Sequence, residues 1–198
     1  MEILRAVADV IIAYLLGSIS FSYLVVKAKT GKDIRTIGSG SAGTTNTARA
    51  VGKPLALLVM ALDIAKGYLA AQLGMALYGD VGGLLAFVAV ILGHMFPFWL
   101  GFHGGKGVAC GAGACLALSP FTFIPALLTF IVLAGVSGYV SLGSVVGCLV
   151  LIVTVFIVPE PWFFRLLYLV MASAVLFMHR ANIKRLLNGT ESKTFHKK

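Results

Sequence analysis

Long apolar runs separated by short polar turns constrain the fold of this chain more than any other feature. Six runs reach, or nearly reach, the length of a bilayer crossing: Val7–Val26, Pro54–Tyr78, Leu84–Leu100, Val108–Ala134, Leu142–Val158 and Trp162–Met178. A helix needs about 20 apolar residues to cross the bilayer core. The chain is 59% hydrophobic and only 12% charged, whereas a soluble domain is about a quarter charged. The sequence therefore predicts an all-α polytopic membrane protein.

The run Val108–Ala134 is interrupted by Ser119–Pro120 and can form one kinked span or two short ones. Two crossings place the basic segment Lys27–Lys53 and the basic tail from His179 to Lys198 on one side of the membrane, whereas one crossing separates them. Lys and Arg collect in cytoplasmic loops. This rule favours about seven transmembrane helices, with the N-terminus outside and the C-terminus in the cytoplasm. No polar linker divides the chain, so we expect a single domain, 1–198.

The net charge of +9 is explained by the basic loops, so no nucleic-acid partner is expected. The three cysteines lie in apolar runs without metal-ligand spacing, which indicates packing residues and no metal site: Cys110, Cys115 and Cys148. No cofactor is expected. Asp63 and Lys66 are three residues apart within a span and share a helix face. A structural ion pair facing the bundle is the favoured interpretation, and a proton or ion relay is the alternative.

An anion-binding loop is predicted at the end of the run Leu84–Leu100. There the chain turns through Gly104, Gly105, Lys106 and Gly107 before the next apolar run begins. The three glycines leave backbone N–H groups free to face a ligand, and the lysine adds a positive charge. The loop is not a Walker A motif, because the spacing is one residue short and Gly107 stands where Ser or Thr would bind magnesium. We therefore predict phosphate binding at the membrane edge without NTPase machinery.

A second glycine-rich loop, Gly38–Gly43, matches the dinucleotide-binding pattern G-x-G-x-x-G, with Asp63 twenty residues further on. A dinucleotide site is excluded because no strand precedes the glycines and Asp63 lies inside an apolar span. The loop instead leads into a short helix, Thr44–Val51, with Thr44 or Thr45 as its cap and Gly52 as its stop.

Arg49 lies on that helix, and arginine is suited to a planar, two-pronged grip on phosphate. A flexible basic loop on anionic lipid is the less favoured alternative. After the last span, the segment from His179 to Gly189 is typical of an amphipathic basic helix on the membrane face. His179 and Asn182 are three residues apart, so they share a face and could point back toward the loops. No Ser–His–Asp order is evident.

Three motifs in order resemble the bacterial acyl-phosphate:glycerol-3-phosphate acyltransferases of the PlsY type. The matching segments are Gly38–Arg49, Gly93–Cys110 and His179–Glu191. Within them the chain departs from the family pattern at five positions: Ser41 for Asn, Thr44 for Ala, Trp99 for Phe, His103 for a common Lys, and Cys110 for Thr.

The resemblance implies transfer of a fatty acyl group from acyl phosphate to the 1-hydroxyl of glycerol 3-phosphate, giving 1-acyl-glycerol 3-phosphate and phosphate. Both substrates carry a phosphate, which suits two glycine-rich loops. The expected catalytic residues are Ser39, Arg49, Lys106 and His179. The expected substrate-binding residues are Gly38, Gly40, Gly43, Thr45, Asn46, Gly104, Gly105, Gly107, Ser141, Ser144 and Asn182. The expected partners are these two substrates and membrane lipid, and a monomer is expected.

The resemblance also implies a multi-pass protein of the bacterial inner membrane with its active site on the cytoplasmic face. A transporter for a phosphorylated metabolite is the alternative function, since it would also need basic loops and charges within the membrane. Such a transporter would show inverted repeats or broken helices in two halves. The sequence shows no such symmetry, and its polar motifs collect on one face.

Overall fold

The computed structural model describes residues 2–194, with side chains from Ile3 onward; His196 and the last two lysines of the basic tail lie outside the described residues. The described part contains helices and no strand. Its α-helices are α1 (Glu2–Ser18), α2 (Phe21–Thr30), α3 (Thr44–Val51), α4 (Lys53–Met95), α5 (Val108–Leu118), α6 (Pro120–Ser137), α7 (Val140–Ile157), α8 (Trp162–Met178) and α9 (Arg180–Leu187). Two 3₁₀ turns, η1 (Ile34–Thr36) and η2 (Phe98–Leu100), lie in the loops.

The helices pack into two compact units, Met1–Leu118 and Ser119–Lys198. The expectation of a single domain stays a prediction. By length and composition, four helices of the described part could cross a membrane, or five if the bent pair α8–α9 counts as one span. This confirms an all-α fold with several apolar helices, while the number seven and the sidedness of the termini stay predictions.

In the first unit, the chain reverses within α4. Tyr78 and Gly79 have non-helical backbone angles, and Gly79 has φ +59°, a conformation that glycine adopts without strain. A Cβ on Gly74 would collide with the carbonyl of Gly82. In a straight helix these residues would lie about 12 Å apart. The two arms of α4 are therefore antiparallel neighbours. The turn is tighter than the gap between the predicted runs Pro54–Tyr78 and Leu84–Leu100, because Gly82 already lies in the second arm, where it permits close packing.

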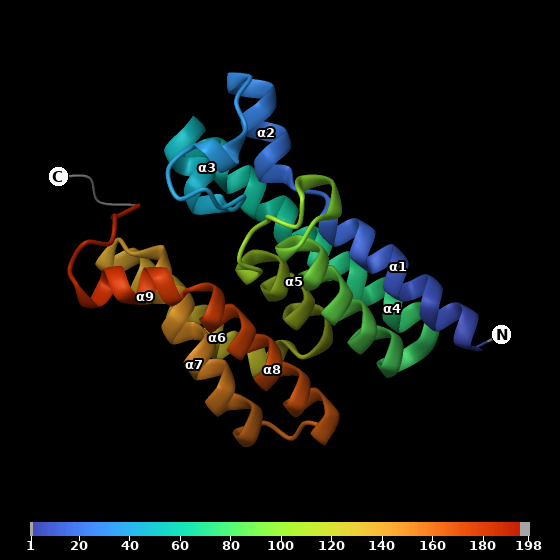
Figure 1. Cartoon of the computed structure of the whole chain (residues 1–198). Coiled ribbons are helices and arrows are strands. Elements are labelled where there is room, and N and C mark those ends of the chain that lie inside the picture. Colours follow the sequence, from blue (N-terminus) through green and yellow to red (C-terminus); the bar gives the residue numbers. More distant parts are fainter. Residues whose placement is uncertain (1, 195–198) are drawn as a thin grey trace. The chain divides into compact units, whose positions relative to one another are not determined.

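A break between α1 and α2 divides the predicted span Val7–Val26, which is not continuous as expected. The break leaves backbone carbonyls without helical partners, which is costly inside a bilayer. Lys66 satisfies two of them, since its Nζ donates to the carbonyls of Gly17 (3.0 Å) and Ile19 (2.7 Å). The indole N–H of Trp99 donates to a third, on Ser18 (2.7 Å). Figure 1 shows α1 lying alongside α4.

The interruption at Ser119–Pro120 separates α5 from α6, as the two-segment interpretation predicts. Ser119 lies outside both helices, and Pro120 begins α6, where its missing N–H costs nothing. In the second unit, α6 packs closely against α7, because Gly143 lies against the carbonyl of Phe130 and Gly147 against that of Ala126. Such small residues allow close helix contact in membranes.

The last predicted span, Trp162–Met178, coincides with α8. The basic helix predicted after it is α9, which is bent by 58° from α8 and begins directly after His179. In the first unit, the predicted helix Thr44–Val51 is α3, and it ends at Gly52 as expected. Its N-cap is Gly43, without a side-chain cap bond. The prediction of Thr44 or Thr45 as the cap is therefore wrong.

Candidate functional site

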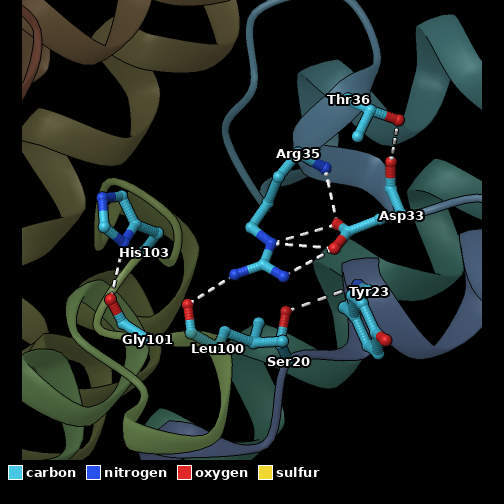
Figure 2. A network of polar contacts seen from close by, with 8 residues as sticks. All are labelled: Ser20, Tyr23, Asp33, Arg35, Thr36, Leu100, Gly101 and His103. Atoms are coloured by element: carbon cyan, nitrogen blue, oxygen red, sulfur yellow. Dashed lines mark hydrogen bonds and ion pairs between the residues drawn. The ribbon is translucent and has the colours of Figure 1, made fainter.

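The two glycine-rich loops lie against each other in the first unit. The backbone N–H of Ala42 donates to the carbonyl of Gly104 at 3.2 Å. The guanidinium of Arg35, in η1, donates to the carbonyl of Leu100, in η2, at 2.6 Å (Figure 2). Two segments that are distant in sequence thus form one structure at the end of the second arm of α4.

Arg35 is itself held by Asp33. The Asp33 carboxylate accepts the backbone N–H of Arg35 (2.9 Å) and its Nη2 (2.6 Å), as Figure 2 shows. These side-chain hydrogen bonds hold the pKa of Asp33 below its ordinary value and raise the pKa of Arg35. An exposed ion pair contributes little to stability by itself. Its effect here is to aim the guanidinium at Leu100. The sequence identified Arg35 only as one basic residue among several.

Asn46 organises the first loop. Its side chain is 2% exposed, and its Nδ2 donates to the carbonyls of Ile37 (2.8 Å) and Ser41 (3.1 Å), with a longer bond to Ile34. Its Oδ1 accepts the N–H of Ser39 at 3.1 Å. A buried amide whose donors and acceptor all bind loop backbone is a framework residue. A contact between Asn46 and substrate stays a prediction, but its geometry favours the framework role.

The second loop is tied to the end of α4 by its glycine N–H groups. Gly104 donates to the carbonyl of Met95 and Gly105 to that of His94, both at 3.0 Å. The prediction that these two N–H groups are free to face phosphate is therefore wrong, because the carbonyls at the helix end already accept them. Gly107 and Lys106, which directly precede α5, stay candidates for the anion site. Sequence alone could not reveal this, because the partners become known only once the loop folds back.

Close packing explains why Gly104 and Gly105 are glycines. A Cβ on Gly104 would collide with the carbonyl of His94 and with Pro97. A Cβ on Gly105 would collide with the imidazole ring of His94 and lie 3.0 Å from the carbonyl oxygen of Ala42. Gly105 is therefore enclosed by the end of α4 on one side and by the first loop on the other.

Three of the polar side chains predicted to act on substrate belong to the first unit, on these two loops or on α3. Ser39 and Arg49 are exposed, and Lys106 is half-buried between its glycines. A Cβ on Gly38 would lie 3.5 Å from Cδ of Arg49, so the arginine side chain runs beside the Gly38–Ser39 turn. Among the described residues, no hydrogen bond or ion pair engages the Arg49 guanidinium. The structure thus brings Arg49 and Ser39 together, with the guanidinium able to bind an anion.

The other residues of the two loops that the sequence singled out make contacts within their own segments. Gly40 forms a turn by donating to the carbonyl of Ile37 at 3.0 Å. Gly43 precedes α3 and accepts the hydroxyl of Thr47, while Thr45 is half-buried in the first turn of that helix. His103 is exposed, and its Nδ1 lies 2.6 Å from the carbonyl of Gly101 (Figure 2). Within residues 2–194, no three His, Cys, Asp or Glu side chains gather so as to hold a metal ion.

In the second unit, the side chains of three polar residues donate hydrogen bonds to Glu191: Ser141 and Asn182, which were predicted to bind substrate, and Arg185. Its Oε1 accepts the hydroxyl of Ser141 (2.8 Å) and Nδ2 of Asn182 (2.7 Å), and its Oε2 accepts Nε of Arg185 (2.5 Å). The tail is fixed further by the N–H of Thr194, which donates to Gly138 at 2.8 Å. Glu191 therefore joins α7, α9 and the tail. Sequence reasoning gave it no role, although it closes the third motif.

Burial alone would raise the pKa of Glu191, but the hydrogen bonds from Asn182, Arg185 and Ser141 outweigh burial and lower it. A lowered pKa means that this carboxylate stabilises the fold fully above the ordinary glutamate pKa, about 4.3. The contribution is lost as the pH falls through the lowered pKa. We expect the protection factors of the amides in residues 188–194, which correct the exchange rates for their intrinsic pH dependence, to fall on acidification below about pH 4. In Glu191→Gln, the protection factors there should be low already at neutral pH and vary little with pH, and a parent-like profile would contradict this role.

His179 lies at the junction of α8 and α9, with its side chain 4% exposed. Its Nδ1 lies 2.8 Å from the carbonyl of Val175. A carbonyl only accepts, so Nδ1 carries the proton and Nε2 is the acceptor in the neutral ring. The hydroxyl of Ser144 donates to the carbonyl of Val140 at 2.9 Å, within its own helix. The predicted contacts of Ser141, Ser144, His179 and Asn182 with substrate stay predictions.

Known proteins resemble this chain in sequence and in fold over almost its whole length. A family model described as glycerol-3-phosphate acyltransferase matches residues 7–189. A glycerol-3-phosphate acyltransferase of Clostridioides difficile (strain 630) is 43% identical, with 100% of both chains covered. Another, of Aquifex aeolicus (strain VF5), is 39% identical, covering 95% of this chain and 98% of the relative.

Two crystal structures of PlsY (YgiH), an integral membrane glycerol 3-phosphate acyltransferase, are similar in fold. The glycerol 3-phosphate form has a TM-score of 0.89 at 37% identity, and the lysophosphatidic acid form 0.84 at 35%. Each comparison covers 95% of this chain and 94% of the other. The resemblance inferred from three sequence motifs is thereby confirmed. This chain, a multi-pass membrane acyltransferase, belongs to the glycerol-3-phosphate acyltransferase family.

Proposed function

We propose that this protein transfers a fatty acyl group from acyl phosphate to the 1-hydroxyl of sn-glycerol 3-phosphate. The products are 1-acyl-glycerol 3-phosphate (lysophosphatidic acid) and inorganic phosphate, which makes the reaction the first acylation of bacterial phospholipid synthesis. The observation that carries the proposal is the hydrogen bond from Ala42 to Gly104, because it joins the loop that carries Ser39 and leads to Arg49 to the loop that carries Lys106. The solved relatives, described as acceptor and acylated-product forms, support it.

The chemistry asks for positioning and charge stabilisation more than for a strong nucleophile. Acyl phosphate is a mixed anhydride and is already activated. The acceptor hydroxyl oxygen bonds to the acyl carbon, the bond from that carbon to the phosphate oxygen breaks, and phosphate leaves with the electron pair. Arg49 and Lys106 bind phosphate and offset the charge that develops on the leaving group. Ser39 donates a hydrogen bond to the reacting groups, and the proton of the acceptor hydroxyl passes to the leaving phosphate.

The donor is the part of this proposal that most needs a direct test. Purified protein is incubated with radiolabelled glycerol 3-phosphate and either acyl phosphate, acyl-CoA or acyl-carrier protein. Labelled lysophosphatidic acid is expected with acyl phosphate alone, together with one equivalent of phosphate. A reaction without protein corrects for spontaneous hydrolysis of the anhydride. Equal turnover with either thioester, or none with acyl phosphate, would overturn the proposal.

His179→Gln is expected to retain measurable turnover. Nδ1 of His179 is held by Val175, so Nε2 is the atom that would act as a base, whereas in our scheme it only orients the glycerol hydroxyls. Loss of a general base usually costs about 10²–10⁴ in rate. We expect a smaller loss, and a pH–rate profile with no limb near the ordinary histidine pKa of about 6.5. Loss of turnover to background, together with such a limb in the parent, would identify His179 as the base.

The loops and the tail are expected on the cytoplasmic side, and the reversal of α4 outside. Single cysteines at Lys32, Asp80 and Ser192 report on this, because all three positions are exposed. They are introduced into a chain whose native cysteines have been replaced by alanine. An impermeant thiol reagent applied to intact cells should label position 80 and should label 32 and 192 only after lysis. Labelling of position 192 from outside would refute the seven-helix topology.

A further inference from the structure

A buried cluster of three ionisable side chains lies beside the loops and is not used by the proposed reaction. Asp63 and Lys66 lie on the first arm of α4, and His94 on the second arm; their exposed fractions are 1%, 4% and 7%. Oδ1 of Asp63 lies 2.8 Å from Nζ of Lys66 and 3.6 Å from Nδ1 of His94. The predicted Asp63–Lys66 pair is thus confirmed, and His94 is a third member that sequence reasoning did not place there.

The cluster has one end at a helix break and the other at the second glycine-rich loop. Lys66 donates to the carbonyls of Gly17 and Ile19 between α1 and α2. His94 contacts Gly105 twice: its carbonyl accepts the N–H of Gly105 at 3.0 Å, and Nε2 and Cε1 of its ring occupy the space where a Cβ of Gly105 would lie. An unbroken series of contacts therefore connects the packed helices to the loop that carries Lys106.

Stability alone is a weak explanation for these buried charges. Desolvation costs several kcal/mol for each ion, and well-packed apolar residues often replace a buried ion pair without loss. Orientation is a stronger explanation. Nδ1 and Nε2 belong to one rigid ring, so a carboxylate 3.6 Å from Nδ1 favours one rotation of the ring, and that rotation places the opposite edge against Gly105. Cys110, a titratable neighbour of Asp63 and Lys66, directs its Sγ to the carbonyl of Val90 at 3.7 Å.

We propose that Asp63 and His94 are positioning residues that set the place of the loop Gly104–Gly107. The imidazole ring of His94 packs against Gly105, and Asp63 fixes the rotation of that ring. The position of Gly105 in turn decides where Lys106 presents its ammonium group to a substrate phosphate. Neither Asp63 nor His94 touches substrate. The inference rests on the proposed function, in which Lys106 binds phosphate.

Kinetics distinguish positioning from a merely structural role. Lys106→Met first identifies which of the two substrates, donor or acceptor, this loop binds. His94→Ala is expected to raise the KM for that same substrate about tenfold or more, with less than about threefold change in the other KM. His94→Asn, whose amide keeps a polar group that can face Asp63, should give an intermediate KM. Because the two residues act as a unit, adding Asp63→Asn to His94→Ala should raise that KM little further.

Hydrogen exchange of residues 101–107 gives a readout that does not depend on the reaction. It should rise about tenfold in His94→Ala and in Asp63→Asn. The matched control is Gln72→Ala, which removes a half-buried polar contact of α4 with Ala117, away from the loop, and should leave exchange and both KM values at parent values.

Failure of the inference and failure of the proposed function give different results. If the parent transfers no acyl group from acyl phosphate but the loop exchanges faster in both variants, the function is wrong and the positioning role stands. If the parent is active and His94→Ala leaves loop exchange and both KM values unchanged, the positioning role is overturned. It is also overturned if His94→Ala lowers only the amount of folded protein, without a selective change in KM.

Discussion

Arg49→Lys is expected to lower kcat/KM by about 10- to 100-fold, although the positive charge is kept. Guanidinium binds phosphate through two parallel hydrogen bonds, and an ammonium group cannot reproduce that fork. One hydrogen bond to a charged group contributes about 1.5–3 kcal/mol, which sets the size of the expected loss. No hydrogen bond or ion pair to another described residue restrains this guanidinium, so an added anion is its natural partner.

The measurement is the initial rate of lysophosphatidic acid formation at several concentrations of each substrate. Arg5→Lys is the matched control, because Arg5 is exposed on α1 and lies outside both glycine-rich loops. It should keep the parent rate. If Arg49→Lys also keeps the parent rate, Arg49 attracts anions only diffusely, as the lipid-binding alternative for this loop requires.

Gly105→Ala is expected to lower activity by a similar factor, about 10- to 100-fold, through shape alone. The added methyl group meets the ring of His94 on one side and the carbonyl oxygen of Ala42 on the other. Backbone cannot move aside as a flexible side chain can, and overpacking of this kind costs about 1–3 kcal/mol. The two loops should separate, and Lys106 should move with them.

Gly135→Ala is the control for this substitution. A Cβ on Gly135, within α6, meets nothing within 4 Å, and alanine is favoured over glycine in a helix by about 1 kcal/mol. That variant should keep parent activity and melt no lower than the parent. The measurements are the steady-state rate and the thermal unfolding midpoint of both variants, each compared with the parent. Parent activity in Gly105→Ala would mean that the loop is not held as tightly as its contacts indicate.

Features encoded by neighbouring residues could be predicted from the sequence. Proline at position 120 predicted the separation of α5 from α6, because proline begins a helix but cannot continue one. Gly52 predicted the end of α3, and the apolar run after Pro161 predicted α8. The spacing of Asp63 and Lys66 predicted their pairing, because residues three apart share a helix face. The motifs themselves predicted the family.

Features that depend on which distant groups meet were decided by the tertiary structure. The break at Ile19 is tolerated because Lys66 and Trp99, far along the chain, satisfy its carbonyls. The N–H groups of Gly104 and Gly105 appeared free in the sequence, yet the end of α4 accepts both. A loop's hydrogen bonds are fixed by what folds against it, and a residue pattern records only that the donors exist.

The same reason explains the candidate site. The sequence identified Ser39, Arg49 and Lys106 by residue type and spacing, since phosphate binding needs cations and hydroxyl groups beside glycine. It could not reveal that Asn46 holds the first loop or that Glu191 gathers Ser141 and Asn182. The amino-acid sequence does not distinguish a buried asparagine or glutamate from an exposed one. Only the packing around them removes water and makes their hydrogen bonds decide the geometry.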